Sequence, residues 1–161
     1  FLFLLFFEIY IIKRLKFMEK HELSIIVKSD ELNHHNTLFV GKALTHLAEI
    51  GFITVCMAHK NPDEVVFYSL DGFKFFSPVP KGNVLTFQGQ IVRVTSHSVT
   101  VYVEGINKLK NTKHIHGYAT YVTVDEKSKA KKKHGIVLDN TDDKSELELR
   151  EKAKELFEKI L

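Results

Sequence analysis

Residues 33–52 read Asn-His-His-Asn-Thr-Leu-Phe-Val-Gly-Lys-Ala-Leu-Thr-His-Leu-Ala-Glu-Ile-Gly-Phe, and this stretch decides the fold. A turn rich in polar side chains runs directly into a long apolar segment, with Gly41 close to the junction. The first turn of a helix leaves about four backbone N–H groups unpaired and carries about half a positive charge. A polar turn at that point can hold an oxyanion or a polarised carbonyl group, so the junction is the first candidate site.

A long helix is predicted over residues 38–59, and Asn61-Pro62-Asp63 ends it. The segment is apolar on most of its surface, lacks proline and holds Gly51 in its interior. A helix of that kind is typically buried in a protein core. Its polar residues follow the spacing i, i+3, i+4 and i+7, which gathers them into one narrow stripe: Lys42, Thr45, His46 and Glu49.

The chain on both sides of this helix predicts β-strands, because it is rich in β-branched and aromatic residues with stretches of period two. The predicted strands span residues 23–27, 65–70, 73–76, 84–95, 99–106 and 115–124. Asp71-Gly72 fits either a hairpin turn or a glycine bulge within one long strand. One long helix followed by mostly antiparallel strands predicts an α+β domain in which a sheet wraps around a buried helix.

Composition narrows the class of protein. The 161 residues, 44% of them hydrophobic and 27% charged, suffice for one globular domain. Much of the net charge of +3 comes from one lysine run near the C-terminus, so we expect no nucleic-acid partner. Cys56 is the single cysteine, which excludes an intrachain disulfide and suits a reducing, cytoplasmic location.

The first seventeen residues differ from the rest of the chain. Residues 1–12 are apolar except for Glu8, and basic residues follow them. A signal peptide has its charges before the apolar region, and a bilayer span needs about twenty residues. We interpret residues 1–17 as a mis-set start or as an extension outside a domain that starts at Met18. A weak membrane anchor is the alternative, and stable membrane insertion is not expected.

The C-terminal part divides into a lysine-rich linker over residues 127–144 and a terminal amphipathic helix over residues 145–161. Ser145 and Glu148 have the spacing of a capping box, which predicts that the helix starts there. The apolar residues of this helix form one stripe: Leu149, Ala153, Leu156, Phe157 and Ile160. Such a stripe predicts docking on the domain or on another subunit.

The helix-start stretch resembles the Asn-x-x-Gly-x-x-Phe-x-Gly motif of hotdog-fold acyl-CoA thioesterases. Asn33, Phe39 and Gly41 match that motif as they stand. Asn36 occupies a position where those enzymes usually have glycine, and Val40 replaces the first glycine of a pair.

Two further segments resemble the same family. Residues 71–83 look like its Gly-x-x-Phe-x-Arg-Pro-Val-x-x-Gly-Asp segment, and residues 121–125 look like its closing strand. The resemblance covers residues 23–125 in the right order and implies a single hotdog domain over residues 18–126. It also favours one bulged strand over a hairpin at Gly72.

The departures from the family pattern concern the catalytic groups. Family members commonly carry an aspartate midway along the helix as catalytic base or water orienter. Ala48 stands at that position here, and Glu49 is the neighbouring carboxylate. Ser77 replaces an arginine of the pattern and Asn83 replaces an aspartate. Adjacent helix positions point about 100° apart, so the base has to be argued separately from the fold.

The resemblance implies hydrolysis of acyl-CoA thioesters to a free acid and CoA, with no metal and no redox cofactor. Asn33 is the candidate for orienting the thioester carbonyl or the water, and its alternative role is that of a turn former. Glu49 is the candidate base, and its alternative role is membership of the solvated polar stripe. The backbone N–H groups of Val40 and Gly41 are the candidate oxyanion donors.

Further polar residues are candidate contacts to the substrate. Those in the turn are His34, His35, Asn36 and Thr37. CoA carries phosphates, so cationic side chains and polar turns are expected at its binding site. The candidates are Lys81, Arg93, Ser96 and Ser98.

The histidines do not predict a metal site. His34 and His35 are loop neighbours without ligand spacing, and His114 and His116 fit a surface pair on one strand face.

A single hotdog sheet leaves an edge and an exposed face. The resemblance therefore implies a homodimer and, in many members, a trimer of such dimers. One site would combine Asn33 of one chain with Glu49 of the other. The main alternative is a catalytically silent hotdog module that binds acyl-CoA or acyl-carrier thioesters, which the departures from the pattern favour. A hotdog dehydratase is a third interpretation, and its only candidate pair is His34 or His35 with Glu49.

Overall fold

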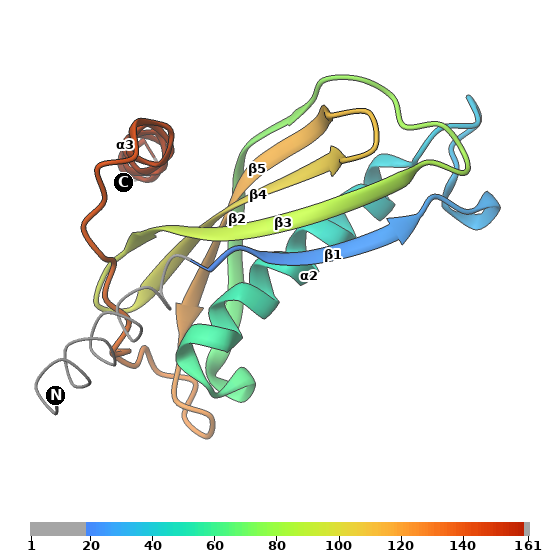
Figure 1. Cartoon of the computed structure of the whole chain (residues 1–161). Coiled ribbons are helices and arrows are strands. Elements are labelled where there is room, and N and C mark those ends of the chain that lie inside the picture. The colour runs from blue at the N-terminus through green and yellow to red at the C-terminus, as the bar shows by residue number, and fades with distance from the viewer. Residues whose placement is uncertain (1–18, 160–161) are drawn as a thin grey trace, which may run out of the picture.

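The computed structural model describes residues 19–159 (Figure 1). The helices and strands are β1 (His21–Ile26), α2 (Val40–His59), β2 (Val65–Phe75), β3 (Val84–Val94), β4 (Ser98–Asn107), β5 (Thr112–Thr123) and α3 (Lys144–Glu158), with short 3-10 turns η1 (Ser29–Glu31) and η2 (Pro62–Glu64). The predicted elements are therefore present, with their ends shifted by a few residues. The expectations for residues 1–17, Met18 and Ile160 lie outside the described residues.

The five strands form one sheet in the order β1-β3-β4-β5-β2, and every neighbouring pair is antiparallel. The sheet curls around α2, and α3 lies on the opposite side of the sheet (Figure 1). This is the α+β hotdog arrangement, so the predicted fold class is confirmed.

Strand β2 is one long strand with a bulge, as the resemblance favoured. Its register with β5 shifts between Asp71 and Lys74, and Gly72 lies there with φ of +58°. Glycine adopts this left-handed conformation at little cost, whereas most residues are strained by it. A Cβ atom at Gly72 would also lie 3.0 Å from Cδ1 of Leu156 in α3. The bulge thus gives α3 room to approach the sheet.

Helix α2 packs with one side against the inner face of the sheet. Its buried residues are Ala43, Leu47, Ile50, Gly51, Thr54 and Val55. They contact inner-face residues such as Leu85, Phe87 and Tyr121, which are almost fully buried. The Tyr121 hydroxyl also donates a hydrogen bond of 2.6 Å to the carbonyl oxygen of Ala48. Although α2 has the length and hydropathy of a membrane span, it is here the core helix of the sheet.

The other side of α2 is not covered within one chain. Ile53 and Met57 are 40% and 49% exposed, and Val66 and Phe67 on the edge strand β2 are 43% and 47% exposed. Apolar side chains of this size on an edge strand and a neighbouring helix are typical of a surface that another chain covers.

Helix α3 docks on the outer face of the sheet of its own chain. Leu149, Ala153 and Leu156 contact Val92 and Tyr118 there. The predicted start at Ser145 is wrong, because the helix begins at Lys144 and the Asp143 side chain accepts a hydrogen bond of 2.8 Å from the Glu146 N–H. Asp is as good an N-cap as Ser, and it occurs earlier in this chain.

The lysine-rich linker is attached to one end of the sheet. Lys132 pairs with Glu64 at 2.5 Å, and its backbone N–H donates to the carbonyl oxygen of Thr123 at 2.9 Å. The His134 N–H donates to the Ser96 carbonyl oxygen at 3.2 Å, and Ile136 is buried in the core. Residues 131–136 therefore form a strap across the end of the sheet at which α2 terminates.

Candidate functional site

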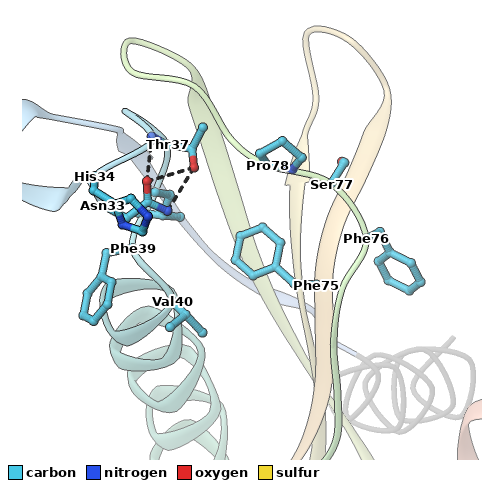
Figure 2. A pocket seen from close by; sticks show the side chains of 10 residues that line it. Asn33, His34, Thr37, Phe39, Val40, Phe75, Phe76, Ser77 and Pro78 are labelled. Atoms are coloured by element: carbon cyan, nitrogen blue, oxygen red, sulfur yellow. Dashed lines mark hydrogen bonds between the residues drawn. The ribbon is translucent and has the colours of Figure 1, made fainter.

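The turn before α2 is held together by the side chain of Asn33. Its Oδ1 accepts a hydrogen bond from the His35 N–H at 2.9 Å. The same oxygen accepts from the Thr37 N–H at 3.2 Å, and Nδ2 donates to the Thr37 hydroxyl at 3.1 Å (Figure 2). Asn36 has φ of +61° within the same turn. Asn tolerates this left-handed conformation better than other non-glycine residues, which explains why it can stand where a glycine is usual.

The start of α2 leaves two backbone donors open. Its N-cap is Phe39, which has no polar side chain and makes no capping hydrogen bond. The N–H groups of Val40 and Gly41 have no acceptor among the described residues. The start itself is fixed, because the Phe39 N–H donates to the Glu31 carbonyl oxygen at 2.8 Å. Two free donors in a fixed place, at the positive end of a helix dipole, are suited to binding a carbonyl oxygen that becomes negative.

Gly41 is required by the side chain of Phe39. A Cβ atom at Gly41 would lie 2.5 Å from Cε1 of the Phe39 ring, which is far inside contact distance. The ring therefore rests directly on the backbone of the first helical turn. Any side chain at Gly41 would displace it.

A cavity of about 450 Å³ lies between this turn, the helix start and the end of β2. It is lined by Asn33, His34, Thr37, Leu38, Phe39, Val40, Phe75, Phe76, Ser77 and Pro78. In Figure 2 the ring of Phe75 is directed across the cavity toward Val40, below the Asn33 turn. The sequence did not predict the four lining residues of this segment as site residues: Phe75, Phe76, Ser77 and Pro78. Their only signal was that they belong to the second segment resembling the thioesterase family.

The end of β2 is anchored by His114. Its Nδ1 lies 2.8 Å from the Ser77 hydroxyl and 3.2 Å from the Ser77 carbonyl oxygen. These two contacts tie the segment after β2 to β5. The expected surface pair of His114 and His116 is wrong: a register shift beside Ile106 turns His114 inward, whereas His116 stacks edge-on against Phe76 at 4.9 Å.

Glu49 does not line the cavity of its own chain. Its side chain is 54% exposed and lies 3.4 Å from Nδ1 of His46, whose Nε2 is 3.1 Å from Glu31. Burial alone would raise the pKa of Glu31, but hydrogen bonds from the Lys28 backbone and from His46 hold that pKa below its ordinary value. Glu49 thus sits in the polar stripe of α2, about 100° around the helix from Ala48.

The remaining predicted contacts lie in two groups. His34 and Thr37 line the cavity, His35 and Asn36 belong to the same turn, and Lys81 follows Pro80, which pairs with Thr37. The second group, Arg93, Ser96 and Ser98, lies at the far end of β3. The ends of an eleven-residue strand are about 33 Å apart, so one chain does not bring the two groups together. Arg93 instead stacks on Phe157 of α3 with its guanidinium carbon 3.4 Å from the ring centre.

Residues 19–159 contain no cluster of three or more His, Cys, Asp or Glu side chains that could hold a metal ion. Cys56 is partly buried in α2, and this burial raises the pKa of its thiol. A thiol with a raised pKa is a weak nucleophile at neutral pH, so Cys56 offers no second catalytic centre.

Comparison with known proteins gives matches to one family. A model of the thioesterase superfamily matches residues 35–111. No curated protein matches the chain significantly. A hexameric acyl-CoA thioesterase is 28% identical, with a TM-score of 0.74 over 87% of this chain and 89% of that one.

Two bacterial acyl-CoA hydrolases share the fold at lower identity. The enzyme from Staphylococcus aureus, solved with butyryl-CoA, CoA and CoA disulfide, is 24% identical with a TM-score of 0.75, over 87% of this chain and 82% of that one. The enzyme from Bacillus cereus is 22% identical with a TM-score of 0.73, over 86% and 84%. The S. aureus enzyme has also been solved with an asparagine, an aspartate or a threonine replaced by alanine.

Proposed function

We propose that the chain is a member of the thioesterase superfamily, whose model matches residues 35–111, and that it is a hotdog-fold acyl-CoA thioesterase that hydrolyses acyl-CoA to a free acid and CoA. The observation that carries the proposal is the cavity at the start of α2, where the N–H groups of Val40 and Gly41 have no acceptor and Phe75 closes the opposite side. The 28% identical acyl-CoA thioesterase supports the substrate class.

The reaction proceeds through attack of water on the thioester carbonyl carbon. The carbonyl oxygen points at the N–H groups of Val40 and Gly41, which stabilise the negative charge of the tetrahedral intermediate. The C–O bond to the water oxygen forms and a base takes the water proton. The C–S bond then breaks and the protonated base returns the proton to the sulfur, so that the CoA thiol leaves. Asn33 holds the turn from which the substrate is positioned, and His34 and Thr37 contact the pantetheine side. No metal or redox cofactor takes part.

The base is Glu49, supplied by a second copy of the chain. Within one chain Glu49 points away from the cavity, so it serves a partner's cavity in a homodimer. The uncovered apolar residues of α2 and β2 support such a dimer, because an isologous contact would bury them on both chains at once. Hexamers among the relatives are consistent with three dimers. Lys81 from the turn side and Ser96 from another chain are the candidate contacts to the CoA phosphates. Arg93 is covered by Phe157, and the Ser98 side chain is buried against Thr95.

Release of free thiol from a panel of acyl-CoAs by the purified full chain tests the proposal. Catalytic turnover with at least one acyl-CoA is the expected result. Binding of acyl-CoA without turnover would overturn it in favour of a silent binding module, for which Ala48 at the expected aspartate position is the supporting observation. Size-exclusion chromatography with light scattering tests the oligomer, and a monomer would refute the shared site.

A further inference from the structure

We propose that the cavity selects an unsubstituted apolar acyl group, and that Val40 and Phe75 set the width of the group it accepts. This inference rests on the proposed thioesterase function and adds the class of acyl group to it. It is carried by the walls of the cavity at the start of α2.

Most of the lining side chains are apolar. Leu38, Phe39, Val40, Phe75 and Pro78 supply carbon surface, whereas the Phe76 ring is turned toward His116. No Asp, Glu, Lys or Arg side chain is among the described residues that line the cavity. An apolar acyl group gains free energy by leaving water for such walls. An acyl group that carries a carboxylate finds no positive charge there.

The polar side chains of the lining are mostly committed to one another. Asn33 and Thr37 are hydrogen-bonded to each other and to the turn backbone. The Ser77 hydroxyl is bonded to His114 behind it. Only His34 keeps its polar atoms free of protein hydrogen bonds among the described residues, and its exposed ring stands at 3.8 Å from that of His35 at the outer edge. A carboxylate or hydroxyl group on the acyl chain would therefore lose its water without gaining a partner among these side chains.

Val40 and Phe75 face each other across the cavity (Figure 2). The Val40 side chain belongs to the same residue as one proposed oxyanion donor, so an acyl group whose carbonyl is held there has to pass beside it. Val is β-branched and stiff at χ1, and the Phe75 ring packs against the hydrophobic core. Neither side chain can move aside easily, so the space between them limits the width of the acyl group.

Phe76 offers a matched control. Its backbone is next to Phe75, but consecutive strand residues point to opposite faces. The Phe76 ring is directed away from Phe75 in Figure 2 and stacks on His116 at 4.9 Å. Shortening Phe76 removes the same aromatic ring as shortening Phe75 without widening the space opposite Val40.

The first test compares butyryl-CoA with succinyl-CoA, which have the same number of acyl carbons and differ by a terminal carboxylate. The full-length protein should have a kcat/KM at least about 100-fold higher for butyryl-CoA, because a buried charge without a partner is strongly disfavoured. Equal values, or a preference for succinyl-CoA, would overturn the selection of apolar groups.

The second test measures width with hexanoyl-CoA and benzoyl-CoA. Val40→Ala keeps the backbone N–H and removes two methyl groups, and Phe75→Leu replaces the flat ring. Each should raise the benzoyl-to-hexanoyl ratio of kcat/KM by about 10-fold or more, since single methylene-sized changes in a pocket are worth about 10–200-fold. Phe76→Leu should leave the ratio unchanged. An unchanged ratio in both Val40→Ala and Phe75→Leu, or an equal rise in Phe76→Leu, would refute the proposal that Val40 and Phe75 set the width of the acyl group.

The two proposals fail in different ways. Absence of thiol release from every acyl-CoA would refute the thioesterase function. In that case isothermal titration with butyryl-CoA and succinyl-CoA still decides the inference, with tighter binding of butyryl-CoA expected and equal or weaker binding contradicting it. Turnover without the predicted selectivity would refute the inference alone.

Discussion

The two ends of α2 are built in opposite ways. At its C-terminus Lys60 adopts the left-handed conformation and its N–H donates to the Cys56 carbonyl oxygen at 2.8 Å, while His59 pairs with Glu64 at 2.8 Å. Lys132 of the strap pairs with the same carboxylate. This end is closed by the chain's own polar groups.

The N-terminus of the same helix is left open. Phe39 caps it without a hydrogen bond, and the N–H groups of Val40 and Gly41 find no acceptor among residues 19–159. Proteins hydrogen-bond nearly all of their polar groups, and an unpaired group near a cavity is expected where a ligand supplies the partner. One helix can thus be closed for stability at its C-terminus and left open for binding at its N-terminus.

Replacing an asparagine at each end gives the largest contrast. Asn33→Ala removes the acceptor that holds the His35 and Thr37 N–H groups, so the turn loosens and kcat should fall by at least about 10²-fold. Asn61→Ala removes a similar hydrogen bond, of 3.2 Å to the Asp63 N–H, at the closed end. It should lower thermal stability slightly and leave kcat unchanged. Similar losses of kcat in both variants would contradict a division of labour between the ends.

Glu49→Gln tests the base and the sharing of the site. Because the amide cannot accept the water proton, kcat should fall by about 10²-fold while acyl-CoA binding is largely kept. Near wild-type turnover would show that Glu49 is not the base and belongs only to the solvated polar stripe of α2.

Mixing the two inactive chains makes that test sharper. If Asn33 of one chain works with Glu49 of the other, a dimer of Asn33→Ala and Glu49→Gln chains contains one intact site. Random reassembly should therefore restore about a quarter of the wild-type activity. Activity that stays at the level of either variant alone would show that the two residues do not serve a site shared between chains.

Gly41→Ala is expected to have a smaller effect. The added Cβ would meet the Phe39 ring at 2.5 Å, so the ring and the first helical turn have to shift relative to each other. Kcat should fall by about 10-fold, because small misplacements at a reacting centre are costly. Gly135→Ala is the matched control in the strap, where a Cβ would meet nothing within 4 Å. An equal loss in both variants would mean that the effect is not local to the open end.

The fold was predictable because local patterns and the family resemblance agreed. The apolar segment at 38–59 predicted a buried helix, and the resemblance decided for a bulge at Gly72 where turn rules left two choices. Asn36 shows a departure from the family pattern that keeps the backbone conformation, since both Gly and Asn adopt positive φ.

The site was less predictable, because it depends on contacts between distant segments. The polar turn and the helix start are continuous in sequence and were found together. Phe75 and Ser77 reach the cavity only through the pairing of β2 with β5, which sequence patterns do not reveal. Arg93 has the charge expected of a CoA contact, but α3 folds back over the sheet and places Phe157 against it. The direction of Glu49 could not be read from its neighbour Ala48, since one step along a helix turns a side chain by about 100°.

The smallest expected effect concerns acid stability at the closed end. Hydrogen bonds from Lys132 and His59 lower the pKa of Glu64 below its ordinary value of 4.5. A carboxylate whose pKa is lower in the folded state stabilises the protein above its unfolded pKa, and this stabilisation is lost as the pH falls through the folded pKa. Glu64→Gln should therefore lower Tm by a few degrees at pH 7, with a difference from wild type that shrinks below pH 4.5.

Differential scanning calorimetry between pH 7 and pH 3 measures this difference in Tm. Kcat at 25 °C should not change, because the open end of α2 is untouched. A Tm difference that stays constant down to pH 3 would show that the charge of Glu64 does not hold the strap, and a fall in kcat would show that the two ends of α2 are coupled.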